Sequence, residues 1–171
     1  MKKIIILSAV LVGLAGCSSS DDAPPSVSGT VTAAELVGTW LRACEADASL
    51  GGSFDLMLTL TATDGIVNIN MYNDATCSPL AQFGMDIETF TYTLGADFAL
   101  DGTVAGIITG TELDSTDTLL GSPDFGVITY DSIALVGTSL YVGDDEADPL
   151  KDASTPAARP TKLDALPFVK Q

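Results

Sequence analysis

The chain has no histidine and few basic residues, with 7 Lys and Arg against 23 Asp and Glu among 171 residues. Without histidine, imidazole-based zinc sites and Ser-His or Cys-His catalytic pairs are excluded. The formal net charge of −16 argues against nucleic acid as a partner, because phosphate binding depends on Lys and Arg. No basic residue lies between Arg42 and Lys151. We therefore expect an acidic surface and no nucleic acid partner.

Sequence motifs that carry enzymatic chemistry are also missing. The chain has no Gly-x-Ser-x-Gly elbow, no phosphate-binding P-loop and no Ser-x-x-Lys pair. Asp86 and Glu88 would lie on one face of one strand, whereas a glycosidase needs two carboxylates from different elements across a cleft. We expect a protein that is not an enzyme and that uses no cofactor.

The first sixteen residues have the order of a secretory leader. Two lysines are followed by an apolar run over residues 4–14 and then by small residues, and this run is too short to span a bilayer as a helix. The quartet Leu14-Ala15-Gly16-Cys17 resembles the bacterial lipobox, in which the cysteine is lipidated and becomes the first residue after cleavage. The resemblance implies that residues 1–16 are a signal peptide and that Cys17 carries acyl chains such as palmitate.

The segment after the cysteine predicts where the protein is held. Residues 17–32 are polar, contain two prolines and lack periodicity, which is typical of a flexible tether. Two or more acyl chains make a durable membrane anchor. In lipoproteins an Asp directly after the cysteine often signals retention in the inner membrane, and this chain has Ser18 there. We expect a lipid-anchored protein of the outer membrane that faces the periplasm or the cell surface.

From residue 33 to residue 171 the sequence predicts an all-β domain. Apolar and polar residues alternate strictly over 54–60, and Asp64-Gly65 then marks a tight turn before a second alternating segment. Further alternating segments follow at short intervals, which gives seven or eight mostly antiparallel strands. A closed barrel and a two-sheet β-sandwich both fit this pattern. From about residue 144 the sequence predicts an irregular C-terminal tail that returns to the domain and ends in a short strand.

Cys44 and Cys77 are the two cysteines left in the domain. Two cysteines in an exported domain usually pair, and two thiols without histidine leave a zinc shell half empty. We therefore predict a disulfide between them.

Gly38-Thr39-Trp40, on the first predicted long strand, resembles the start of the lipocalin-like barrels of exported proteins. The resemblance implies a barrel whose closed end is filled by the indole of Trp40. It also implies an arginine against that indole, and Arg42 is our candidate for stacking on the ring and donating to carbonyl oxygens.

The acidic run Asp144, Asp145, Glu146 and Asp148 offers the carboxylate oxygens that calcium prefers. It lacks the alternating Asp/Asn and Gly order of a calcium-binding loop, so we expect a solvated loop and no metal.

Two functions from different classes fit these features. The first is a non-catalytic envelope module with a filled barrel that acts through structure or through contact with another envelope protein. The alternative is a carrier of a small apolar or amphipathic ligand near the outer membrane, motivated by the apolar faces of the strands. Packing and a ligand cavity compete for one interior in a domain of this size, which favours the filled barrel.

We predict that Cys17→Ala leaves the protein unlipidated and unprocessed, because the thiol is the acceptor of the lipid. Metabolic labelling with palmitate measures this directly. Label retained by the variant would contradict the assignment of Cys17.

Overall fold

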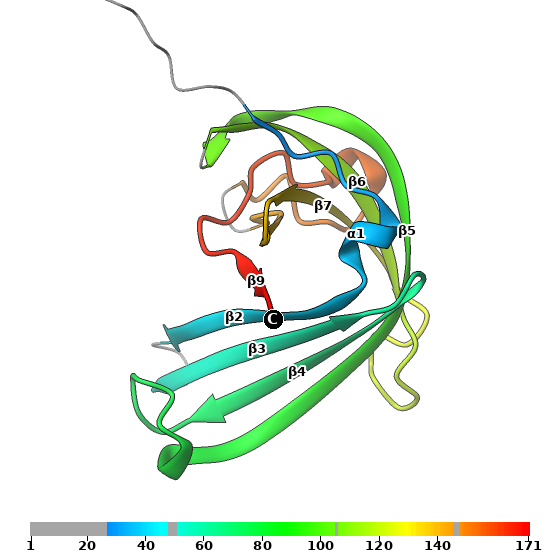
Figure 1. The fold of residues 1–171 in the computed structure, drawn as a ribbon. Coiled ribbons are helices and arrows are strands. Elements are labelled where there is room, and N and C mark those ends of the chain that lie inside the picture. Colours follow the sequence, from blue (N-terminus) through cyan, green and yellow to red (C-terminus); the bar gives the residue numbers. More distant parts are fainter. Residues whose placement is uncertain (1–26, 48–50, 105, 146–147) are drawn as a thin grey trace, which may run out of the picture.

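The computed structural model describes residues 27–47, 51–104, 106–145 and 148–171. Within these ranges the strands are β1 (Val27–Ser28), β2 (Gly38–Asp47), β3 (Gly52–Leu60), β4 (Asp64–Tyr72), β5 (Gln82–Val104), β6 (Ile107–Asp117), β7 (Ile128–Val136), β8 (Ser139–Val142) and β9 (Phe168–Lys170). A short helix, α1 (Ala33–Leu36), and two 3-10 turns, η1 (Pro79–Ala81) and η2 (Pro156–Ala158), complete the elements (Figure 1). In the part of the chain described here, no helix is long and apolar enough to cross a membrane.

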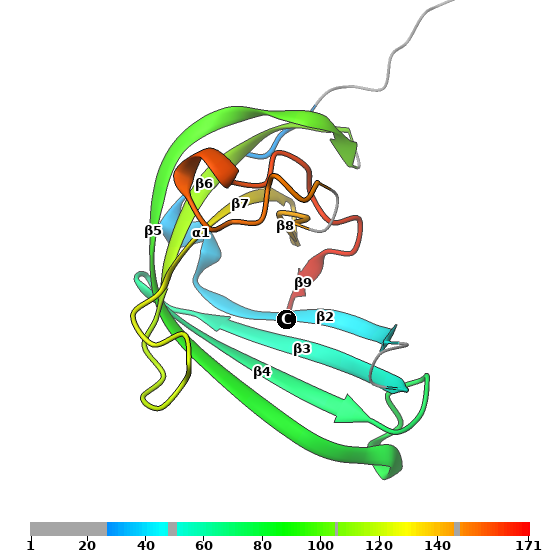
Figure 2. The same cartoon turned by 180° about the vertical axis from the view of Figure 1, so that it is seen from behind.

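Eight of the strands form a closed antiparallel barrel. Their order is β6-β5-β4-β3-β2-β9-β8-β7, and β7 pairs again with β6 to close the ring. The closed ring confirms the predicted barrel and excludes the two-sheet sandwich. The 23-residue strand β5 pairs with β4 through its first half and with β6 through its second. It therefore curves around one side of the barrel (Figures 1 and 2).

The half of the interior next to α1 is filled by apolar side chains from the inner faces of the strands, from α1 and from the segment that precedes it. Leu58 pairs with Trp40 on one side and with Val67 on the other, so all three side chains share the inner face. The buried members of this core are Val31, Leu36, Trp40, Leu58, Leu60, Tyr92, Ile133, Leu140 and Phe168, each at most 7% exposed. Full burial of one large apolar side chain contributes about 1.5–3 kcal/mol, so this core is the main source of stability.

The C-terminal tail covers the outer face of β7 and β8. Ala134, Tyr141 and Leu163 form part of a second, smaller apolar cluster on that face. The tail also satisfies main-chain groups of β7, because the Tyr130 N–H donates to the Ala153 carbonyl. Tyr130 lies before the stretch of β7 that pairs with β8. The tail thus pairs with the edge of β7 at the positions where β7 has no pairing with β8.

The N-terminal segment 27–31 belongs to the barrel, whereas the sequence assigns it to the flexible tether. β1 pairs in parallel with β6, and the Leu135 N–H donates to the Gly29 carbonyl. A Cβ atom at Gly29 would lie 2.5 Å from the Ala134 Cβ, so only glycine permits this close approach. The earlier part of the tether, the leader and Cys17 lie outside the described residues.

A disulfide joins Cys44 to Cys77, as predicted, with 5.7 Å between the Cα atoms. Cys44 lies in β2 at the register shift between Arg42 and Glu45, and Cys77 lies in the loop between β4 and η1. The bond therefore ties the far end of β2 to a loop two strands away.

Replacing both cysteines, as Cys44→Ala/Cys77→Ala, should lower the free energy of unfolding by about 3–4 kcal/mol, because the bond closes a long loop in the unfolded chain. Urea denaturation followed by Trp40 fluorescence measures the change. A thiol reductant should produce the same loss in the wild type and none in the double variant. An unchanged urea midpoint in the double variant would contradict the prediction.

Candidate functional site

The closed end of the barrel is built around Trp40, which is fully buried. Its indole N–H donates to the Leu36 carbonyl at the end of α1 at 2.8 Å. Lys170 places its Nζ 4.9 Å from the centre of the Trp40 rings and donates to the Glu35 carbonyl at 2.8 Å. Gly38 adopts a φ of +139°, and a Cβ there would lie 3.0 Å from the Lys170 Cε. The glycine thus leaves room for the lysine.

The prediction that Arg42 stacks on Trp40 is wrong, because Lys170 is the residue that pairs with Trp40 across β2 and β9. Arg42 lies two residues further along β2, about 6.6 Å away along the strand. Its guanidinium lies 6.0 Å from the centre of the Phe168 ring. It pairs instead with Glu45 at 2.8 Å and with Asp164 at 2.5 Å, and so joins β2 to the tail.

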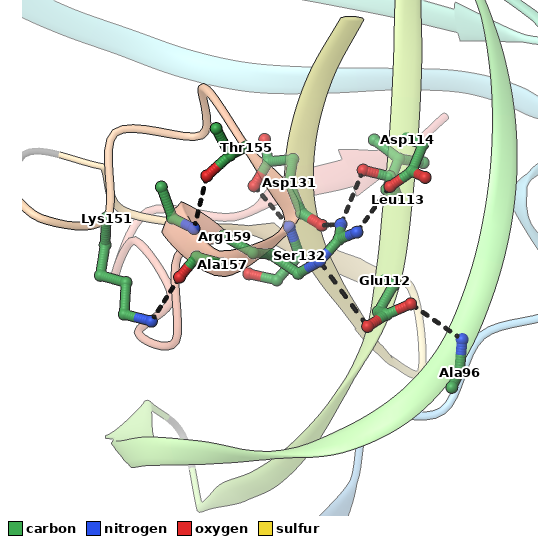
Figure 3. Close-up of polar contacts among 11 residues, drawn as sticks. Ala96, Glu112, Leu113, Asp114, Asp131, Ser132, Lys151, Thr155, Ala157 and Arg159 are labelled. Atoms are coloured by element: carbon green, nitrogen blue, oxygen red, sulfur yellow. Dashed lines mark hydrogen bonds and ion pairs between the residues drawn. The ribbon is translucent and has the colours of Figure 1, made fainter.

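A second arginine, Arg159, fixes the tail onto β6 and β7 (Figure 3). Only 7% of its side chain is exposed. The guanidinium donates to the carbonyls of Leu113 and Asp131 and to the carboxylate of Asp114 at 2.6 Å, and Glu112 lies 3.8 Å from its Nε. All these partners lie on β6 or β7, so the arginine bridges the two strands. Sequence reasoning missed it, since an arginine in a loop carries no local signal of burial.

The carboxyl group of Asp131 is buried beneath this contact. Burial raises its pKa from 3.8 to about 7, and the nearby Asp145 raises it further, while N–H groups of Ser132 and Gly143 and the charge of Arg159 oppose the rise. Ser132 Oγ, next to it in the chain, is buried without a hydrogen-bond partner among the described residues. Asp131 is therefore the carboxyl group in this site that titrates near neutral pH.

A groove of about 380 Å³ lies beside the tail on the outer face of β5, β6 and β7. Its floor consists of two rows of residues that pair directly across the three strands. One row is Thr91, Thr116 and Ile128, and the other is Thr93, Asp114 and Tyr130. Tyr92, between Thr91 and Thr93, and Thr63, from the turn between β3 and β4, complete the lining. The Arg159 guanidinium lies 5.8 Å from the centre of the Tyr130 ring.

The acidic run after β8 forms no metal centre in the part of it that the structure describes. Asp145 is exposed, and Asp148 accepts the Leu150 N–H as part of a turn. The Asp144 N–H donates to the Lys162 carbonyl. Glu146 lies outside the described residues. Over the described ranges, no group of three or more acidic or cysteine side chains is arranged to hold a metal ion.

Comparisons with known proteins give no information on function, so function is inferred from the geometry alone. No family model, curated protein or solved structure matches the chain. A barrel fold by itself hosts many functions, so function is argued below from the interior and from the outer faces of this barrel.

The raised pKa of Asp131 predicts a stability that falls as pH rises. Between pH 3.8 and about 7 the folded state keeps a proton that the unfolded state has lost, so raising the pH through this window destabilises the fold. Asp131→Asn keeps an acceptor oxygen but does not titrate, and it should remove that loss. Urea midpoints at about pH 5 and about pH 8 measure it.

The matched control is Asp86→Asn, which removes an exposed charge from β5. This control should keep most of the wild-type fall in stability, because Asp86 is exposed and does not act on Asp131, although its charge helps to raise the pKa of Glu88. Equal pH dependence in Asp131→Asn and the wild type would contradict the assignment.

Proposed function

We propose that the protein is a lipid-anchored, non-catalytic barrel of the cell envelope that acts through its outer surface. The observation that supports this most directly is the half of the interior around Trp40, which buried side chains fill. Trp40, Leu58, Ile133, Leu140 and Phe168 come from five different strands and meet in one buried cluster. Side chains that occupy the middle of the barrel leave the outer faces as the place for specific contacts.

The anchor in this proposal is Cys17, attached through the tether that precedes β1. Its support is the lipobox resemblance of residues 14–17 and the polar composition of the segment that follows. A domain held by acyl chains on a tether stays near the membrane while its outer faces remain open to other envelope components. The outer membrane is the proposed location.

A second candidate, a carrier of small apolar ligands, is favoured by the half of the interior that lies toward the disulfide. There the inner-face residues Phe54, Leu56, Ile69 and Met71 are only partly buried. The ion pairs of Arg42 with Glu45 and Asp164 lie in the same half. Charged groups in this region favour an amphipathic ligand over a purely apolar one.

Titration with an apolar probe separates the two candidates. Because buried side chains fill the half of the interior around Trp40, a fluorescent long-chain fatty acid added to the full protein should show no saturable change in its own emission. Saturable binding that Leu56→Trp abolishes, and that Met57→Trp on the outer face of the same strand leaves intact, would support the carrier and contradict our proposal. The two variants are matched because these neighbours point to opposite faces of β3.

A further inference from the structure

The groove on β5, β6 and β7 has the makings of a binding site for an uncharged ligand that is rich in hydroxyl groups. We propose that it binds neutral saccharide units, either as a short free sugar or as part of a polymer. This inference rests on the proposed function, because it names the ligand class for one outer face of the barrel.

Four of the hydroxyl groups that line the groove are free to bind a ligand. The hydroxyls of Thr91, Thr93, Thr116 and Tyr130 have no hydrogen-bond partner within the described residues. A hydroxyl both donates and accepts, so four of them in one concavity match a ligand whose own groups also do both. Ile128, which is 45% exposed, adds an apolar contact. This mixture suits a sugar ring, which has apolar C–H faces and a polar edge.

The size and shape of the groove also suit a saccharide. Two rows of residues across three strands cover about 10 Å by 7 Å, given the spacing of strands and of alternate residues. The volume of about 380 Å³ lies at the lower end of the range for small-ligand sites. Because most of the lining residues are exposed or half-exposed, a sugar in the middle of a polymer could bind as well as a free one.

Two of the lining residues are held in place before any ligand arrives. Arg159 pairs with one carboxylate oxygen of Asp114 and lies against the Tyr130 ring. No described residue donates to the second oxygen of Asp114, whose side chain is 42% exposed, so this oxygen can accept hydrogen bonds from a ligand. Groups that are already ordered lose less conformational entropy on binding. Arg159 is thus a positioning residue for the groove.

The charges of the groove argue for a neutral ligand. An anionic ligand would meet the Asp114 carboxylate, and none of the described residues that line the groove is basic and could compensate. Arg159 is buried, and its donors already contact protein acceptors. Among the described residues of the lining, a cationic ligand would find the Asp114 carboxylate alone, and the ion pair with Arg159 weakens its attraction for a second cation. A neutral ligand with hydroxyl groups therefore suits the groove better than a charged one.

The test uses the full chain and three neutral disaccharides, maltose, cellobiose and chitobiose, with spermidine as a cationic probe. Titrations are followed by amide chemical shifts. We expect saturable binding of at least one disaccharide, with shift changes concentrated at residues 91–93, 114–116 and 128–130. Retention on starch, cellulose or chitin, with and without the matching disaccharide as competitor, distinguishes a polymer ligand from a free sugar, and either result supports the inference.

Thr93→Val/Thr116→Val removes two hydroxyls at nearly constant shape and should weaken binding about tenfold or more. The matched control is Thr59→Val, on the outer face of β3 and outside the groove, which should bind as the wild type does. Trp40 emission and urea midpoints show that each variant is folded.

Three results would overturn the inference: no binding of any disaccharide, binding that the double variant leaves unchanged, or tighter binding of spermidine at the same residues. If the fatty acid is still excluded from the interior, these results leave the proposed function standing. Entry of the fatty acid into the interior would contradict the proposed function whatever the sugars do.

Discussion

Three residues at the end of the chain, Phe168 to Lys170, join the two ends of the sheet. Through β9 they pair with β2 on one side and with β8 on the other, and without them both strands would be open edges that invite aggregation. The same three residues place Phe168 in the core and Lys170 over Trp40. The same three residues therefore close the ring of strands and cover one end of the barrel, and both depend on the docking of the C-terminal tail.

Because the chain has few cations, the position in which the C-terminal tail docks on the barrel is more specific. Of the few cations, Arg42 joins β2 to the tail, Arg159 joins the tail to β6 and β7, and Lys170 sits on the buried indole. Each of them lies at a place where the tail meets the barrel. In a chain with so many carboxylates, a misplaced tail would bury acids without partners, which is costly. The cations thus select the correct docking of the tail, and little positive charge is left for the outer faces.

The sequence predicted those features that depend on neighbours along the chain or on residue type. Alternation over 54–60 and the turn at Asp64-Gly65 predicted the hairpin of β3 and β4, and two cysteines in a domain that we expected to be exported predicted the disulfide. The strand count left barrel and sandwich open, since the pairing of β6 with β7 and of β9 with its neighbours is set by long-range contacts. The cation over Trp40 was misassigned for the same reason. Arg42 is near in sequence, but the register of β2 with β9 brings Lys170 opposite the indole.

The groove is a second feature that the sequence could not predict, because it depends on long-range strand registers. Its threonines are ordinary strand residues in the sequence, and only the registers of β5 with β6 and of β6 with β7 bring them into two rows. A strand has two faces, and the inner faces here are largely committed to the core. On the outer face of β7 and β8 the tail occupies the surface, while the rows beside it remain open. Specific binding by a filled barrel must use such uncovered rows, and on an acidic surface poor in cations hydroxyl groups are the chemistry that remains for recognising a neutral ligand.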